Sequence, residues 1–233
     1  MGLPQSSKGF HNSLQSWLAG FQVGDYGGGV HRDGVGRMIE LIMDSPEPVT
    51  VISITPAVSM AEALRREPRI AGKVRLVGMY GSIGKRHEGE DGAIAEYNVV
   101  KDIRAAQALF QPPWRGFTVT PLDTCGMVRL RSDLYRRIEH ATDPVLRELM
   151  ASYNVWKAWY GHRLDGTSSL LFDTVAVHLA SSTAFLKMKT MILRVDEEGY
   201  TRQDPAHGQA VEVAIEWENL EGYCKFLVDT LLN

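Results

Sequence analysis

The sequence predicts an α/β fold with an open, mostly parallel sheet flanked by helices. Residues 49–54 (VTVISI) and 74–79 (VRLVGM) are short apolar segments with the length and composition of buried strands. Residues 58–66 between them are amphipathic, which predicts a crossover helix. A strand–helix–strand unit of this kind is normally parallel and right-handed. Residues 116–120 (GFTVT) predict a third strand of the same sheet.

The rest of the chain continues this alternation, except at its start, where a helix at 13–21 precedes any strand. Late strands at 187–195, 200–201 and 209–217 predict a β-hairpin or meander. No repeat or low-complexity linker interrupts the chain, so we expect a single domain over residues 1–233. The remaining helices are predicted from apolar periodicity at 35–43, 98–110, 132–140, 144–160, 169–180 and 219–232.

Composition is that of an ordinary globular protein. The 233 residues are 44% hydrophobic and 23% charged, with a net charge of −3. No basic block favours nucleic acid or an anionic membrane as partner. The two cysteines, Cys125 and Cys224, have no metal-ligand spacing and form no disulfide framework, which fits a reducing compartment. Without a signal peptide or membrane-spanning run, a cytoplasmic protein with a small-molecule partner is expected.

The loop between the strand at 74–79 and the helix at 98–110 ends in Ala95-Glu96-Tyr97-Asn98. Asn98 is a good N-cap residue, because its side chain can accept from open amides of the first helical turn. In open α/β sheets, ligands bind beyond the carboxyl ends of the strands, where this loop lies. A capped helix with a solvated glutamate is an equally weighted interpretation of the same residues.

Five motifs in order resemble the nucleoside hydrolases (inosine/uridine-preferring N-ribohydrolases). The resemblance runs from about Gly28 to near the C-terminus and is greatest to fungal members, whose Trp-x-Asn-Leu-x-Gly-Tyr helix reads alike. The motifs are His31-Arg32-Asp33-Gly34, Thr55-Pro56-Ala57-Val58-Ser59-Met60-Ala61, Val77-Gly78-Met79-Tyr80-Gly81, Ala95-Glu96-Tyr97-Asn98 and Phe172-Asp173-Thr174-Val175-Ala176.

The resemblance implies an open α/β sheet with a Ca²⁺ ion at the carboxyl ends of its strands. Carried over residue by residue, Glu96 and Asn98 would bind ribose. Asp173 and the carbonyl of Val58 would be Ca²⁺ ligands. His31 is a candidate substrate-binding residue, because it belongs to the family-like motif His31-Arg32-Asp33-Gly34.

This sequence departs from the family pattern at three places. The family's N-terminal Asp-x-Asp-x-x-x-Asp-Asp cluster, which supplies most metal carboxylates, has no counterpart, so the domain resembles one that lacks its first β–α units. Phe172 stands where some members have a histidine, and Glu90 where the family has an asparagine. Ca²⁺ takes about six to eight oxygens, which Asp173 and one carbonyl do not provide. We therefore expect no metal, no cofactor and no nucleoside hydrolysis by this chain alone.

A pocket without its metal predicts a metal-free enzyme of specialised metabolism, of cyclase, isomerase or lyase type. A mostly apolar cleft with few polar groups suits an apolar small molecule. Glu96 and Asp173 are the expected acid–base residues, because a partly buried carboxyl can be tuned for that role. The expected substrate-binding residues are His31, Met79, Tyr80, Tyr97, Asn98, Trp156, Trp159 and Phe172.

Two other functions stay open at this point. One is an N-ribohydrolase whose aspartate cluster comes from elsewhere, and the other is a non-catalytic binding protein. The strand at 49–54 would form an open apolar edge, which stable proteins cover. We expect either the segment 1–29 or a second copy of the chain to cover it, which predicts a refolded N-terminus or a homodimer.

Overall fold

The computed structural model describes residues 18, 20–159 and 166–233 of the chain. These residues form two compact units. The first contains Arg32–Val128 and Leu170–Leu220, and the second contains the described residues of 4–31, 129–169 and 221–233. The single domain expected from the sequence stays a prediction.

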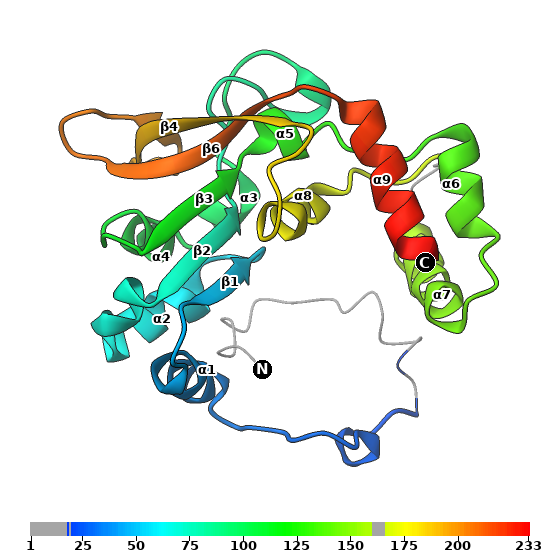
Figure 1. The fold of residues 1–233 in the computed structure, drawn as a ribbon, viewed down its shortest axis with the longest axis horizontal. Helices are drawn as coiled ribbons and strands as arrows, with labels where there is room; N and C mark the ends of the chain where they lie inside the picture. Colours follow the sequence, from blue (N-terminus) through cyan, green and yellow to red (C-terminus); the bar gives the residue numbers. More distant parts are fainter. Residues whose placement is uncertain (1–17, 19, 160–165) are drawn as a thin grey trace. The chain divides into compact units, whose positions relative to one another are not determined.

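The first unit is built on one six-stranded sheet, which confirms the predicted fold class (Figure 1). Four strands run parallel in the order β1-β2-β3-β6, and β4 joins β6 and β5 antiparallel at the far side. The late hairpin is therefore present as predicted. The strands are β1 (Val49–Ser53), β2 (Val74–Met79), β3 (Gly116–Thr120), β4 (Leu186–Val195), β5 (Thr201–Gln203) and β6 (Gln209–Trp217).

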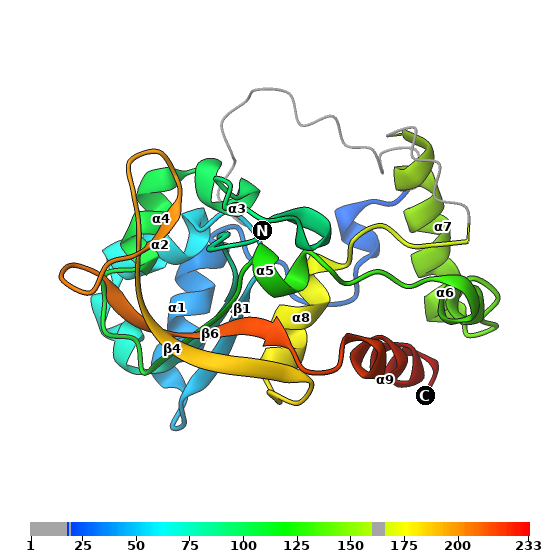
Figure 2. The same cartoon turned by 90° about the horizontal axis from the view of Figure 1, so that it is seen from above.

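Helices cover both faces of the parallel strands (Figure 2). The helices α1 (Gly34–Asp44), α2 (Val58–Arg66) and α4 (Ile103–Leu109) lie along one face, and α8 (Phe172–Leu179) lies along the other. Strand alternation sends one set of side chains into the core beneath the first three helices. Its central members, Val74, Leu76, Phe117 and Val119, are all buried.

The helix expected at 98–110 is two helices, because Asp102 starts a new one. The side chain of Asp102 accepts from Ala105 N at 2.9 Å, which caps α4. The shorter α3 (Tyr97–Val100) precedes it. Its N-cap residue is Glu96, and the expectation that Asn98 is the cap is wrong. Glu96 itself has an extended backbone conformation, with φ −75° and ψ 146°, and its side chain accepts from Asn98 N and Val99 N.

Two further boundaries differ from expectation. The helix expected from residue 169 begins at Phe172, and the Ser168 hydroxyl before it accepts from Leu130 N at 2.9 Å. The helix α5 (Leu122–Cys125) directly after β3 was not expected, because four residues are too few to show periodicity. Three short 3-10 helices complete the described residues: η1 (Val23–Asp25), η2 (Pro68–Gly72) and η3 (His87–Gly89).

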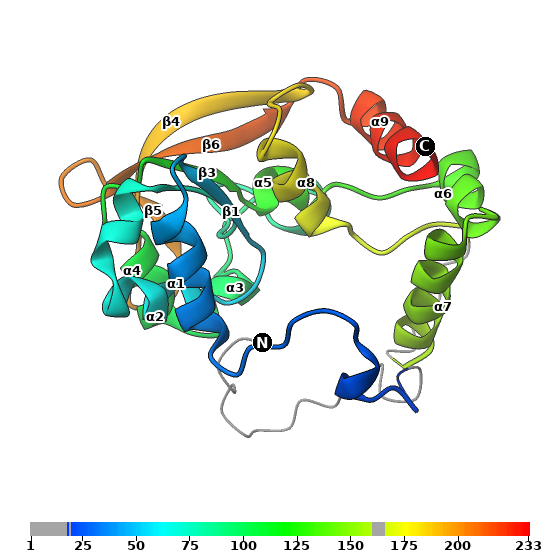
Figure 3. The same ribbon diagram turned by 60° about the horizontal axis from the view of Figure 1, so that its bottom comes forward.

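The second unit contains α6 (Ser132–Glu139), α7 (Pro144–Trp159) and nearly all of α9 (Leu220–Leu232) (Figure 3). An ion pair of 2.8 Å joins Arg137 of α6 to Asp229 of α9. The hydroxyl of Tyr153 accepts from Ser169 N at 2.6 Å and ties α7 to the following segment. The helix expected at 13–21 lies mostly outside the described residues.

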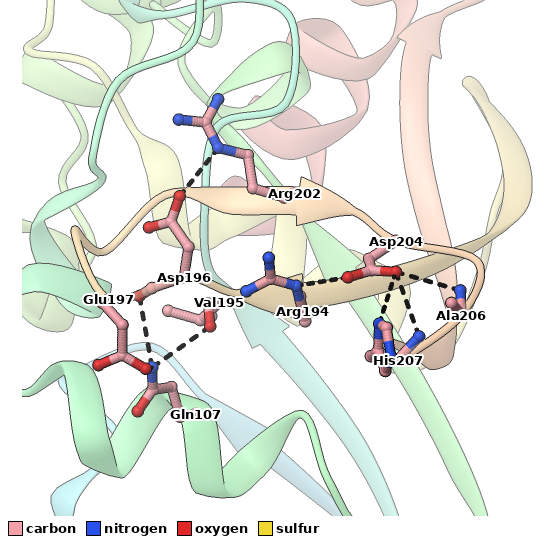
Figure 4. Close-up of polar contacts among 9 residues, drawn as sticks. All are labelled: Gln107, Arg194, Val195, Asp196, Glu197, Arg202, Asp204, Ala206 and His207. Carbon is pink, nitrogen blue, oxygen red and sulfur yellow. Dashed lines mark hydrogen bonds and ion pairs between the residues drawn. The ribbon is translucent and has the colours of Figure 1, made fainter.

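Polar contacts hold the β4–β5 hairpin in place, as Figure 4 shows. Arg194 pairs with Asp204 at 2.6 Å, and Arg202 pairs with Asp196 at 3.0 Å. From α4, Gln107 Nε2 donates to Glu197 at 3.2 Å. These contacts hold the two sides of the hairpin together and join its turn to α4, and the hairpin carries Thr201 of the site described below.

The strand β1 lies at one end of the sheet formed by the described residues. Its covering by the segment 1–29 or by a second copy stays a prediction, and residues 1–17 and 19 lie outside the described part. None of the helices in the described part is both long and apolar enough to cross a membrane.

Candidate functional site

Glu96 lies at the carboxyl end of β2, at the point where α3 begins. Its side chain is 3% exposed and accepts from three backbone amides. Oε1 accepts from Asn98 N at 2.8 Å, and Oε2 accepts from Gly81 N at 3.2 Å and Val99 N at 3.3 Å. Because an ionised carboxylate has about four acceptor positions, roughly one remains for another donor.

The surroundings of Glu96 raise its pKa to about 7. Burial is the main cause, because it disfavours the charged form, and the three amide hydrogen bonds oppose it. The negative charge of Asp173 raises the pKa of Glu96 further. Asp173 lies in the first turn of α8, and burial also raises its own pKa. The two residues expected as acid–base groups therefore affect each other electrostatically.

Asn98 faces the end of the same strand with its amide group. Nδ2 donates to the carbonyl of Met79 at 3.1 Å and contacts Met79 Sδ at 3.3 Å. An amide NH₂ has two hydrogens, so these contacts use both. Asn98 Oδ1 has no donor among the described residues, although the side chain is buried. Asn98 therefore offers one unfilled acceptor beside Glu96.

The apolar residues expected in the cleft differ in exposure. Met79 and Tyr80 are 3% and 1% exposed and belong to the core. The hydroxyl of Tyr80 donates to Thr55 O at 2.8 Å and contacts Ser53 Oγ at 2.6 Å. Tyr97 is 57% exposed, and Lys101 Nζ lies 4.9 Å from its ring centroid. Substrate contact by these residues stays a prediction, and only Tyr97 among the three presents a ring to solvent.

Gly81 joins this cluster to strand β5. Its φ of 86° is in the left-handed region, which favours glycine. A Cβ at this position would overlap Thr201 Oγ1. Thr201 is 3% exposed, and its hydroxyl has no hydrogen-bond partner within the described part of the chain. The hairpin residue Thr201 thus packs against the backbone whose amide binds Glu96.

The loop after Gly81 is fixed by Asp123 of α5. Its carboxylate accepts from Ile83 N at 2.8 Å, Gly84 N at 2.7 Å and Lys85 N at 3.0 Å. Further along the loop, Glu90 pairs with Arg86 at 2.9 Å. No sequence signal indicates this clamp, because Asp123 meets the loop from about forty residues further along the chain.

His87 is a candidate that sequence reasoning missed. The loop places its imidazole edge-on to Phe172, with ring centroids 5.7 Å apart. Phe172 directly precedes Asp173 and begins α8. A histidine is therefore held close to the position that the family pattern assigns to one. No sequence signal indicates it, because the approach depends on the path of the loop.

The other predicted site residues belong to the second unit. His31 is exposed. In α7, Trp156 stacks on Tyr153 with centroids 5.6 Å apart, and Trp159 is 56% exposed. Contact of His31, Trp156 or Trp159 with a substrate stays a prediction.

The carboxylates of the site do not complete a metal centre by themselves. Across residues 18, 20–159 and 166–233, no three His, Cys, Asp or Glu side chains are arranged to hold a metal ion. The resemblance assigns Asp173 and the Val58 carbonyl to Ca²⁺, which takes about six to eight oxygens. The described residues therefore do not fit Ca²⁺ without further ligands.

Comparison with known proteins gives one family. The model of the family described as inosine-uridine preferring nucleoside hydrolase matches residues 11–225. The chain is 30% identical over 126 residues to the inosine-uridine preferring nucleoside hydrolase of Crithidia fasciculata, covering 52% of this chain and 39% of that protein. It is 36% identical over 93 residues to the Leishmania major protein of the same name, covering 40% of this chain and 29% of that protein. The chain thus spans about two fifths or less of these relatives.

Solved structures show the same fold. A plant nucleoside hydrolase superposes with a TM-score of 0.70 at 18% identity, covering 85% of this chain and 66% of that one. A purine-preferring ribonucleoside hydrolase from Gardnerella vaginalis superposes with a TM-score of 0.71 at 19% identity, covering 87% of this chain and 67% of that one.

Proposed function

Because the chain belongs to the inosine-uridine preferring nucleoside hydrolase family, we propose that Glu96 and Asn98 bind the ribose of a ribonucleoside. The proposal rests on the hydrogen-bonding character of the cluster. Glu96 has about one acceptor position left, and Asn98 Oδ1 is unfilled. Both groups need O–H donors, and the vicinal hydroxyls of ribose supply them.

Burial makes this recognition selective. An acceptor removed from water binds a matching donor strongly and rejects a ligand that leaves it unpaired. Glu96 and Asn98 are 3% and 7% exposed. A nucleoside that lacks the 2′ and 3′ hydroxyls should therefore bind much more weakly, by about tenfold or more for each lost bond to a charged acceptor.

Nucleoside hydrolysis is proposed only for a form of the protein that has more ligands than the described residues provide. Ca²⁺, when bound, would orient the ribose hydroxyls and a water molecule. Asp173 is the side chain of this chain that would contribute to holding it. Tight Ca²⁺ binding by the purified chain in calorimetry would support hydrolysis, and release of ribose from inosine or uridine would demonstrate it.

A metal-independent acid–base reaction on an apolar small molecule is the second candidate, and the pKa of Glu96 favours it. A general acid or base works best when its pKa lies near the working pH. Glu96 has a pKa of about 7 and is fixed by three amides. The family comparisons do not support a particular cyclase, isomerase or lyase reaction. A third possibility, binding without catalysis, predicts the same nucleoside affinity with no turnover.

The test is calorimetric titration of the purified 233-residue chain with inosine, uridine and their 2′,3′-dideoxy counterparts. We expect binding of the ribonucleosides and loss of binding for the dideoxy compounds. Asn98→Leu should reduce the difference, because it removes one of the two acceptors and leaves Glu96. Glu198→Gln, an exposed carboxylate on the β4–β5 turn, is the control that should change nothing. Equal affinity for ribo- and dideoxynucleosides would overturn the proposal.

A further inference from the structure

A hollow lies beside β1, β2 and β3, away from the ends at which Glu96 lies. It measures about 500 Å³ and crosses the amino-terminal halves of β1, β2 and β3 beside the turn after α8. We call it the Arg75 groove. Its polar lining consists of Thr50, Arg75, Thr118, Ser181, Ser182 and Thr183.

Arg75 is the cation of this groove, and its surroundings leave it unpaired. Strand register places it between Thr50 of β1 and Gly116 of β3. Gly116 has no side chain, and the stem of Arg75 lies 3.7 Å from where a Cβ would stand. Within the described residues Arg75 makes no ion pair or side-chain hydrogen bond. Its guanidinium therefore keeps its full set of donors.

Hydroxyl groups line the same groove as this cation. Thr50, Thr118 and Thr183 have no side-chain hydrogen bond to another described residue. Ser182 Oγ accepts from Ala184 N at 3.1 Å, which leaves its O–H to donate. The groove is lined by no Asp or Glu side chain. Its lining thus offers one positive charge and several donors, with no carboxylate to neutralise them.

We propose that the Arg75 groove binds a phosphate group, either free or carried by a small metabolite. A planar guanidinium matches two phosphate oxygens at once, and hydroxyl donors can satisfy the others. A volume of about 500 Å³ is in the range of small-molecule sites. The site is separate from the ribose cluster and does not depend on the function proposed for it.

The fold separates the two sites along one helix. Asp173 lies in the first turn of α8, and Leu179 at its end lines the groove. Six residues of helix span about 9 Å at 1.5 Å per residue. Figure 1 shows α8 beside the parallel strands. A ligand in the groove would therefore contact the end of α8 opposite to Asp173.

One acidic side chain opposes the anion. Glu212 of β6 is the register partner of Thr118, so both side chains lie on the same face of the sheet. The carboxylate of Glu212 accepts from the hydroxyl of Thr190. This bond draws the carboxylate toward β4, and Glu212 does not line the groove, so its charge acts on a bound phosphate only across the sheet and should weaken binding modestly. Removing that charge is thus an independent test of the site.

The experiment uses ¹H–¹⁵N NMR and calorimetry of the 233-residue chain with inorganic phosphate, ribose 5-phosphate and ribose. We expect shifts at Arg75, Thr118 and Thr183 with both phosphates and none with ribose. Affinity for ribose 5-phosphate should rise as the pH passes about 6, where a phosphate monoester becomes a dianion. Equal affinity for inorganic phosphate and ribose 5-phosphate would show that the groove recognises the phosphate group alone. Tighter binding of ribose 5-phosphate would show that the ligand is a phosphorylated metabolite.

Variants decide whether Arg75 carries the binding. Arg75→Gln should weaken phosphate binding about tenfold or more, because a bidentate charge-assisted contact is lost. Glu212→Gln should strengthen it about twofold to threefold. Arg104→Gln, an exposed arginine on α4 outside the groove, is the matched control. Equal losses in Arg75→Gln and Arg104→Gln, or no shifts in the groove at tens of millimolar phosphate, would overturn the proposal.

Discussion

Replacement of Glu96 by glutamine should change how stability depends on pH. In the folded protein the pKa of this carboxyl is raised from 4.5 to about 7, chiefly by burial. At about 1.4 kcal/mol per pKa unit, this shift corresponds to about 3 kcal/mol. A raised folded-state pKa stabilises the fold fully below about pH 4.5. That stabilisation is lost as the pH rises through about 7.

Glutamine at position 96 removes the titrating carboxyl and lowers the free energy of unfolding by an amount that does not depend on pH. Its amide oxygen can take the place of Glu96 Oε2, which accepts from Gly81 N and Val99 N. The NH₂ group then faces Asn98 N, another donor. Leaving a buried donor unpaired costs about 1–3 kcal/mol. The variant should therefore be less stable than the native chain by this amount at about pH 5, where the native carboxyl is protonated.

At about pH 8 the native carboxyl is ionised, and its cost of about 3 kcal/mol offsets the cost of the amide. The difference between the two proteins should then fall to about zero. The assay is urea unfolding followed by circular dichroism at four pH values between these limits. Glu198→Gln, on an exposed turn, should run parallel to the native protein throughout. Parallel profiles for Glu96→Gln as well would refute the reasoning.

Three other substitutions test the contacts around Glu96. Thr201→Val should stabilise the protein by about 1 kcal/mol, because it removes a buried hydroxyl that has no partner among the described residues. The control Thr120→Val breaks a 2.9 Å hydrogen bond to Thr124 and should destabilise the protein by about as much. Gly81→Ala should lower the free energy of unfolding by about 3 kcal/mol, because a Cβ there overlaps Thr201 and φ is 86°. The control Gly92→Ala has a φ of 101° but open space around it, so it should lower the free energy of unfolding by only about 1 kcal/mol. Asp123→Asn should increase hydrogen exchange at Ile83, Gly84 and Lys85 at least tenfold without affecting β2, and unchanged exchange would contradict the clamp role.

The sequence by itself determined the sheet. Apolar runs gave β2 and β3 with their observed bounds, and the amphipathic segment between β1 and β2 gave α2. These elements follow from local periodicity, because buried strands and crossover helices need apolar residues at fixed spacing. The order of the five motifs also indicated the family, and the family model that matches residues 11–225 confirms it.

Only the tertiary structure decided how the site is built. Glu96 caps α3 by accepting from Asn98 N and Val99 N, and Gly81, fifteen residues earlier in the chain, donates a third amide to the same carboxylate. The raised pKa of Glu96 comes from burial and from Asp173 on a distant helix. Asp123 and His87 gain their roles from the path of one loop. Such contacts join residues far apart in sequence, and no local pattern encodes the distance between them.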